Sequence, residues 1–110
     1  MTIIYTNREL DKRRLYAHTR AQALPMKEIA DGTIIDPVEL VIYSDVNNTG
    51  EETEYVSIVT EEHIHIASSS PTLIREIRSI VDLMEGEEFK LKICKRQSKG
   101  GRTYTTCELV

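Results

Sequence analysis

Tyrosines are the residues of this sequence whose type and position best fit a chemical task. The chain holds five tyrosines, one phenylalanine and no tryptophan. In four predicted strands, the alternation of side chains places a tyrosine on the face opposite the aliphatic residues. These tyrosines are Tyr16, Tyr43, Tyr55 and Tyr104. An exposed ring can stack on any nucleobase for roughly 1–3 kcal/mol, so the four are candidate base-stacking residues; β-propensity alone is the alternative explanation.

Cations cluster close to Tyr104. Residues 95–102 carry four positive side chains, two glycines and no carboxylate. Lysines and arginines beside an aromatic platform can neutralise the phosphates of a nucleic acid. The residues expected to contact phosphates are Lys92, Lys95, Arg96, Lys99 and Arg102. Together, the tyrosines and the cations predict a binding surface for single-stranded nucleic acid.

The net charge of −4 at first argues against a polyanionic partner. The charges are segregated along the chain, however. Residues 1–28 carry six basic and three acidic side chains, and residues 93–110 carry four and one. Residues 29–92 carry four basic and fourteen acidic side chains. Such blocks are typical either of solvated surface or of a molecule with one anion-binding side.

The sequence offers little for catalysis. It contains no Gly-rich phosphate loop, no Ser-His-Asp spacing and no C-x-x-C pair. His63 and His65 are two residues apart on a predicted strand, but two histidines without further ligands are a weak metal signal. A metal-assisted nuclease using Glu51, Glu52 and His63 is the remaining catalytic hypothesis. We expect a protein without enzymatic activity, cofactor or metal.

A C-terminal hairpin over residues 87–110 has to position the cations and Tyr104. Phe89, Leu91 and Ile93 alternate with lysines, as on a strand with one buried face. An odd number of residues in the connection keeps acidic Glu108 out of the core. The pairs then predicted are Phe89 with Leu109, Leu91 with Cys107, Ile93 with Thr105, and Lys90 with Glu108. Cys94 and Cys107 face opposite sides, so a disulfide is not expected.

The strongest helix signal covers residues 71–84. Ser70 is a good N-cap, and Pro71 suits the first helical position. Aliphatic residues recur at steps of three and four on one side of this segment. Gly86 is the expected C-cap. The aliphatic stripe predicts a helix that packs on the core.

The beginning of the chain is less regular. Residues 1–11 predict an N-terminal arm or frayed turn, with capping-box spacing from Thr6 to Glu9. Alternation over residues 12–20 predicts a first strand with a cationic and aromatic outer face. A helix over residues 7–23 is the competing interpretation, because Leu, Ala and Arg favour helices. Residues 25–30 predict a short connection with one helical turn.

Further β-rich stretches follow a turn signal at Asp31 and Gly32. They are residues 33–44, with a bulge or edge position at Pro37, residues 54–60, and a short strand at 64–66. The resulting order predicts an all-β or α+β domain over residues 12–110. Its expected architecture is a five-stranded Greek-key barrel of the oligonucleotide-binding (OB) type, with one helix between the third and fourth main strands. An open α+β sheet with the helix on one face is the runner-up.

A chain of 110 residues is long enough for one domain with a core of its own. No stretch approaches the roughly 20 apolar residues of a membrane span, and the N-terminus lacks a signal-peptide core. With two cysteines and no expected bridge, the sequence predicts a reducing, cytoplasmic environment.

Several stretches resemble those of one known family. They are residues 31–35, the turn at 51–53, the helix end at 81–84, the strand at 88–93, residues 98–100 and the polar closing strand. In these the chain is similar to the single-stranded DNA-binding proteins of small, protein-primed bacteriophages. The resemblance implies a protein that coats displaced strands during DNA replication, removes hairpins, blocks nucleases and supports a viral DNA polymerase in the host cytoplasm. Tyrosines are the stacking residues it implies.

A phage protein–protein interaction module is the second hypothesis for function. The acidic residues 29–92 would then mimic DNA or bind a host enzyme, and the tyrosines would be interface hot spots. The two hypotheses differ in a direct way, because an interaction module of this kind should not shift a labelled single strand of DNA.

Overall fold

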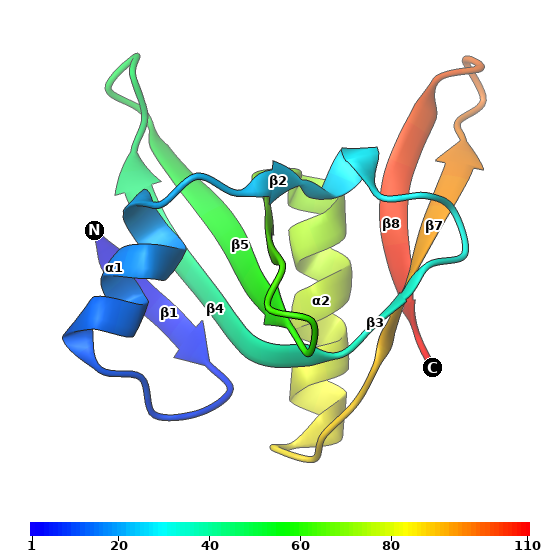
Figure 1. The fold of residues 1–110 in the computed structure, drawn as a ribbon. Coiled ribbons are helices and arrows are strands. Elements are labelled where there is room, and N and C mark those ends of the chain that lie inside the picture. The colour runs from blue at the N-terminus through cyan, green and yellow to red at the C-terminus, as the bar shows by residue number, and fades with distance from the viewer.

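The computed structural model describes residues 1–110, which form two β-sheets and two α-helices (Figure 1). The five-stranded sheet has the order β1 (Thr2–Thr6), β4 (Pro37–Val46), β5 (Glu52–Thr60), β6 (His65–Ser68) and β2 (Leu24–Pro25). The three-stranded sheet has the order β3 (Ile34–Ile35), β7 (Leu91–Gln97) and β8 (Thr103–Leu109). The helices are α1 (Lys12–Arg20), α2 (Pro71–Met84) and the short 3₁₀ turn η1 (Met26–Glu28).

One stretch of chain connects the two sheets. β3 and β4 are separated by Asp36 alone, and β3 pairs with β7 while β4 pairs with β1 and β5. The register of β4 against β5 shifts between Pro37 and Glu39, which confirms the predicted bulge at Pro37. At the other side of the molecule β6 and β8 are not paired with each other. The fold is therefore a mixed α/β arrangement of mostly strands that does not close into a barrel.

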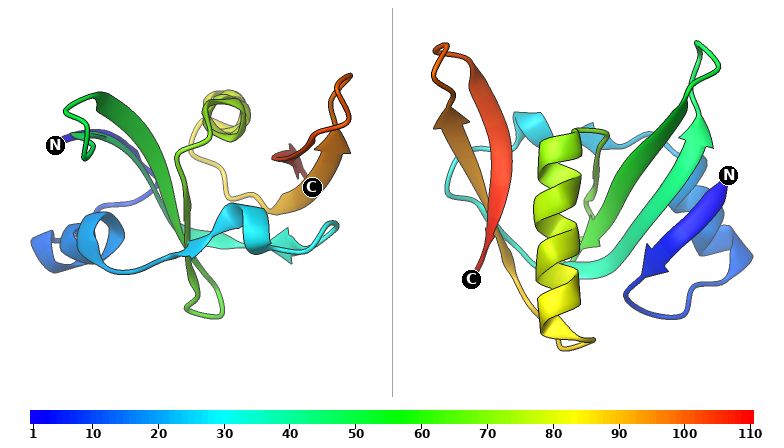
Figure 2. Two further views of the ribbon diagram at one scale, coloured as in Figure 1. Left: turned by 90° about the horizontal axis from the view of Figure 1, so that it is seen from above. Right: turned by 180° about the vertical axis from the view of Figure 1, so that it is seen from behind.

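Helix α2 lies between the two sheets when the molecule is seen from above (Figure 2). Its aliphatic stripe is buried, with Leu73 and Ile77 almost without exposed surface, and it packs with Leu40, Ile58 and Ile93 in one core cluster. The predicted start is confirmed, because Ser70 Oγ accepts a hydrogen bond from the Leu73 amide. No helix of the structure combines the length and the hydropathy that crossing a bilayer requires.

The C-terminal end of α2 differs slightly from the prediction. The capping residue is Glu85, which has a left-handed backbone with φ of 49°, and Gly86 follows with φ of 90°. Two successive positive φ values reverse the chain toward β7, and glycine adopts the second of them without steric cost.

The beginning of the chain departs most from the predictions. Residues 2–6 form β1 at the edge of the sheet instead of an arm, and residues 12–20 form α1 instead of a strand. The helix starts after Asp11, whose carboxylate accepts a hydrogen bond from the Arg14 amide at 2.8 Å, so the capping-box spacing from Thr6 to Glu9 is not used. The competing helix over residues 7–23 is correct in type but too long. Hydrogen bonds from His18 to β4 and β5, and an ion pair from Arg14 to β4, favour the helix over an alternating strand.

The C-terminal hairpin keeps its predicted faces but not its predicted pairs. The connection between Gln97 and Thr103 has five residues, an odd number, and Cys94 and Cys107 lie on opposite faces. Each residue of β7 pairs with a residue of β8 that lies two positions later in the chain than predicted. The observed pairs are Leu91 with Leu109, Lys92 with Glu108, Ile93 with Cys107 and Lys95 with Thr105. The Ser98 amide donates to the Arg102 carbonyl and closes a turn in which Gly101 has a φ of 79°. This turn lets β7 and β8 pair closer to the tip of the hairpin.

Asn7 fastens the loop after β1 to the bulge in β4. Its side-chain amide donates to the carbonyls of Pro37 and Val38 at 3.0 and 3.2 Å, and its side-chain oxygen accepts from the Leu40 amide at 2.9 Å. These backbone groups face the bulge, where the regular ladder does not satisfy them.

Replacement of Asn7 by Ala should destabilise the fold by roughly 1–3 kcal/mol, because three backbone hydrogen bonds at a half-buried bulge lose their partner. Urea unfolding followed by circular dichroism measures this loss. Asn48→Ala is the matched control, since that exposed amide in the β4–β5 turn makes no side-chain hydrogen bond. Equal stability of the two variants would contradict the role of Asn7.

Candidate nucleic-acid interface

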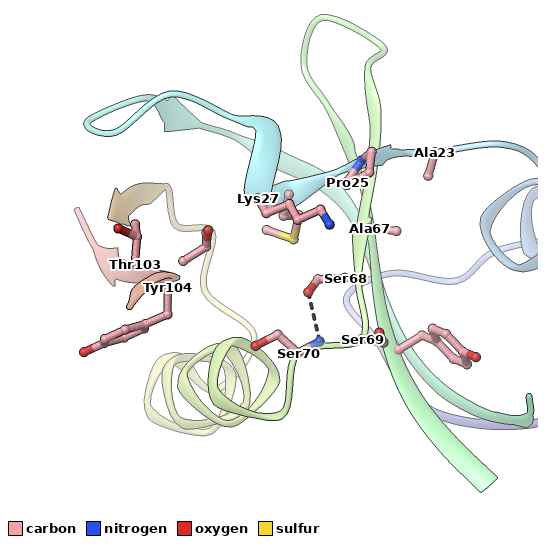
Figure 3. A pocket seen from close by; sticks show the side chains of 12 residues that line it. Ala23, Pro25, Lys27, Ala67, Ser68, Ser69, Ser70, Thr103 and Tyr104 are labelled. Carbon is pink, nitrogen blue, oxygen red and sulfur yellow. Dashed lines mark hydrogen bonds between the residues drawn. The ribbon is translucent and has the colours of Figure 1, made fainter. Parts of the chain in front are cut away.

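A groove of about 620 Å³ lies between β8 and the unpaired edge of the five-stranded sheet (Figure 3). β2 and η1 form one wall, the end of β6 and the two residues before α2, Ser69 and Ser70, form the floor, and Thr103–Thr105 of β8 form the opposite wall. We call this feature the β6–β8 groove. On this side of the molecule β6 pairs with β2, and β8 pairs only with β7.

Two of the predicted stacking residues line the β6–β8 groove. Tyr55 reaches it from β5 and Tyr104 from β8. Tyr104 is 40% exposed and Tyr55 is half-buried, so part of each side chain is accessible. The two side chains come from different sheets and border the groove, and Figure 3 shows the Tyr104 ring directed away from Ser68 and Ser70. An accessible ring at the border of a groove is a surface on which a flat, unpaired base can stack.

Tyr43 supports Tyr55 and does not reach the groove. The two residues are paired across β4 and β5, with ring centroids 5.1 Å apart and planes inclined by 21°. Tyr43 is only 7% exposed, and burial raises the pKa of its hydroxyl. The reason is helix α1, which covers this face of the sheet and brings Thr19 and Arg20 beside the tyrosine pair. A buried ring behind an accessible one restricts the orientations of Tyr55.

Tyr16 lies apart from the other tyrosines. It projects from α1, is 67% exposed and does not line the groove. The prediction of one face with four tyrosines is therefore wrong. Because residues 12–20 are helical, their outward side chains follow a helical period and not the alternation of a strand.

The predicted phosphate contacts fall into three groups. Lys95 has a structural role, since its ammonium donates to the Lys27 carbonyl and, at 2.9 Å, to Thr105 Oγ1. Arg96 forms an ion pair with Glu108 and lies across from Tyr104. The remaining three, Lys92, Lys99 and Arg102, are exposed and form no ion pair. Of these, Lys99 and Arg102 are in the turn next to the groove, whereas Lys92 is near the start of β7 and does not line it.

Lys27 is a groove residue that the sequence did not reveal. It belongs to η1, is exposed, forms no ion pair and extends over the groove (Figure 3). The hydroxyl-bearing residues of the floor were missed as well: Ser68, Ser69 and Ser70. A single lysine in a short connection carries no periodic signal, and the serines were interpreted only as a helix start.

No carboxylate lines the β6–β8 groove, although the chain has eighteen acidic residues. A group of acids instead lies near the far end of α2, around Asp36 and the turns that contain Glu61, Glu62, Glu87 and Glu88. The 14-residue helix separates the two regions by about 20 Å. This spatial separation makes the groove accessible to an anion despite the negative net charge.

The acids and histidine of the nuclease hypothesis are not brought together. Glu51 and Glu52 are at the beginning of β5, and His63 is in the turn after its end. The structure contains no group of three or more metal-ligating side chains.

A buried polar chain connects α1 with the sheet. His18 Nε2 lies 2.8 Å from Glu39 Oε1, His18 Nδ1 lies 2.7 Å from Ser57 Oγ, and Ser57 Oγ lies 2.7 Å from His65 Nε2. Serine, histidine and carboxylate in this order resemble a hydrolase triad. Ser57 and the His18 side chain have no exposed surface, however, so a substrate has no access to this serine. His18 and His65 therefore have hydrogen-bond partners that no spacing in the sequence indicates.

Comparison of the chain with known protein families, curated proteins and solved structures finds no match. The groove is therefore interpreted from its own geometry.

The two cysteines should not act as nucleophiles in the folded protein. Both are buried, and burial raises the pKa of the Cys107 thiol to about 12. At a pH of about 8 the thiolate fraction is then very small and inaccessible. We expect negligible labelling of the native protein by iodoacetamide and labelling of both thiols after unfolding in guanidinium, with mass spectrometry as the measurement. Rapid labelling of the native protein would contradict this picture.

Proposed function

We propose that the β6–β8 groove binds single-stranded DNA without sequence preference. The observation that carries this proposal is a groove with Tyr55 and Tyr104 among its lining residues, Lys27 above its floor and no carboxylate in its lining. The protein would act by binding alone and not as an enzyme.

Base stacking favours a single strand over a duplex at this site. The rings of Tyr55 and Tyr104 have to meet the faces of bases, and in a duplex these faces are already stacked on their neighbours. Serine and threonine hydroxyls between the rings can donate to or accept from many partners, so they do not demand one particular base edge. The site therefore tolerates different sequences.

Phosphates would be neutralised by Lys27 within the groove and by Lys99 and Arg102 at its rim. Lys95 takes part indirectly, because its hydrogen bond to the Lys27 carbonyl fixes the wall that carries Lys27. The first turn of α2 also faces the groove with Ser70, and a helix N-terminus adds a partial positive charge.

We infer that the fold is an opened form of the five-stranded OB-type barrel. The run from β3 to β4 pairs in both sheets, as a long curved first strand would, and α2 lies in sequence between β6 and β7. β8 pairs only with β7, which leaves the barrel open at the groove. OB-type domains bind oligonucleotides on comparable surfaces, which agrees with the proposed ligand.

In this proposal the protein coats strands that are displaced during replication of a phage genome in the host cytoplasm. The resemblance of residues 31–35 and 88–93 to the proteins of protein-primed bacteriophages supports that role, and a viral DNA polymerase is the expected partner. The protein–protein module remains the alternative; a labelled strand that does not shift, together with a co-purifying host protein, would favour it.

Removal of a stacking ring should weaken binding. Tyr104→Ala should lower the affinity for fluorescein-labelled oligo-dT roughly fivefold to 150-fold, measured by anisotropy, because one stacked base loses about 1–3 kcal/mol. Tyr55→Leu should act in the same direction while keeping apolar contact with Tyr43. Tyr16→Ala is the matched control, since this ring is exposed but outside the groove. If Tyr16→Ala and Tyr104→Ala bound equally, the groove would be the wrong site.

Salt should weaken binding of the wild-type protein steeply, as expected when phosphates displace counterions. Lys27→Gln should reduce the slope of log affinity against log salt by about one, since one phosphate contact is lost. Lys12→Gln, an exposed lysine at the start of α1, should leave the slope unchanged. Equal affinity for oligo-dT at about 50 and about 200 mM salt would contradict the electrostatic part of the proposal.

A further inference from the structure

The buried polar chain joins four elements of the fold. Glu39 comes from β4, His18 from α1, Ser57 from β5 and His65 from β6. Arg14 of α1 closes the chain at one end with hydrogen bonds from Nε and Nη2 to the Glu39 carboxylate, at 2.7–3.2 Å. Few apolar contacts hold α1 to the rest, because His18 is its only buried residue and none of its residues belongs to the core cluster. The polar chain is therefore the main attachment of α1.

With both histidines neutral, one arrangement of protons satisfies all links. The Glu39 carboxylate only accepts, so His18 Nε2 donates to it and His18 Nδ1 is an acceptor. The Ser57 hydroxyl then donates to His18 Nδ1, and His65 Nε2 donates to Ser57 Oγ. One further proton can be accommodated, because His65 Nε2 can accept from the Ser57 hydroxyl when its other ring nitrogen donates to the Gln22 backbone. A second proton makes both histidines donate to Ser57 Oγ, which leaves the buried Ser57 proton without an acceptor. It also places two charged rings with centroids 5.6 Å apart, beside Arg14.

The polar chain is coupled to the wall of the groove. α1 continues directly into residues 21–25, and this segment joins the sheet through only two pairs, Leu24 with Ile66 and Pro25 with Ala67. His65 immediately precedes these partners on β6. Ala23 and Pro25 line the β6–β8 groove. Movement of α1 away from β5 would therefore displace a wall of the proposed binding site.

We propose that the His18–Ser57–His65 chain is a proton-operated latch, which releases α1 and residues 21–25 in mild acid and thereby weakens binding in the β6–β8 groove. The release concerns the fold alone, whereas the effect on binding rests on the proposed function.

The groups around His65 set the sign of the effect. Burial lowers the pKa of His65, and the nearby His18 and Arg14 lower it further, while the Gln22 backbone acts in the opposite direction. β5 contributes the uncharged Ser57. A depressed histidine pKa means that the latched state is fully stable above the ordinary histidine pKa of about 6.5 and loses stability as the pH falls through the lower, folded value.

Glu39 is the remaining charged group that faces the chain. Burial alone would raise the pKa of Glu39, but hydrogen bonds from Arg14 and His18 hold it below its ordinary value. This carboxylate therefore stays ionised at a pH of about 5.5, so a loss of the latch at that pH belongs to the histidines.

Hydrogen exchange with mass spectrometry on the full chain tests the latch. After correction for intrinsic rates, peptides from residues 12–25 should exchange roughly tenfold faster at a pH of about 5.5 than at about 7.5, while peptides from α2 should not change. His65→Gln can still donate to Ser57 but cannot gain a proton, so its exchange should be slow at both pH values. Ser57→Ala lacks the link and should exchange fast at both. His63→Asn, which alters an exposed histidine, should behave like the wild type.

Equal exchange of residues 12–25 at both pH values, or unchanged pH dependence in His65→Gln, would overturn the latch. Binding of labelled oligo-dT at matched ionic strength tests the coupling. Acidification adds positive charge and by itself strengthens DNA binding. A severalfold loss of affinity in the wild type would therefore have the opposite sign. Its absence from His65→Gln would attribute the loss to His65. Opening of α1 with unchanged affinity would overturn the coupling. Opening without oligo-dT binding at either pH would leave the latch intact and refute the proposed function.

Discussion

Burial of one face of α2 between two sheets is the interaction on which the rest of this structure depends. Leu73 and Ile77 belong to a single aliphatic cluster with residues of both sheets, so the helix holds the two sheets together through a common core. Only the run from β3 to β4 connects the sheets through strand pairing. The opposite side stays open, and the β6–β8 groove is the direct consequence of that opening.

The location of charge explains how an acidic protein can offer a site to an anion. Five of the acids lie around Asp36 and the turns at the far end of α2, and none lines the groove, whereas Lys27, Lys99 and Arg102 lie in or beside it. Net charge governs behaviour at long range, but a ligand in the groove experiences the residues within about one Debye length, roughly 8–10 Å at moderate salt. The cations of β7 and of the turn that follows it serve two purposes, since Lys95 and Arg96 stabilise the hairpin while Lys99 and Arg102 form no ion pair.

A second buried region, made of polar side chains, lies between α1 and the five-stranded sheet. Helix α1 covers Tyr43, Ser57 and His65, and the connection between them is made by hydrogen bonds and not by aliphatic packing. Buried polar groups of this kind are specific in geometry and sensitive to their protonation state. The same helix converts Tyr43 from a surface residue into a support for Tyr55, so α1 shapes the site without lining it.

The sequence by itself determined the elements whose signals are local. Ser70 and Pro71 start α2, Pro37 places the bulge, and the odd connection sets the faces of the C-terminal hairpin, because caps, proline geometry and alternation act over a few residues. Tertiary structure decided the rest. Residues 12–20 alternate like a strand yet form α1, since Glu39 of β4 and Ser57 of β5, both distant in sequence, are the hydrogen-bond partners of His18. The presence of Tyr55, Tyr104 and Lys27 in the lining of one groove depends on how two sheets pack around one helix, which no pattern within a single segment encodes.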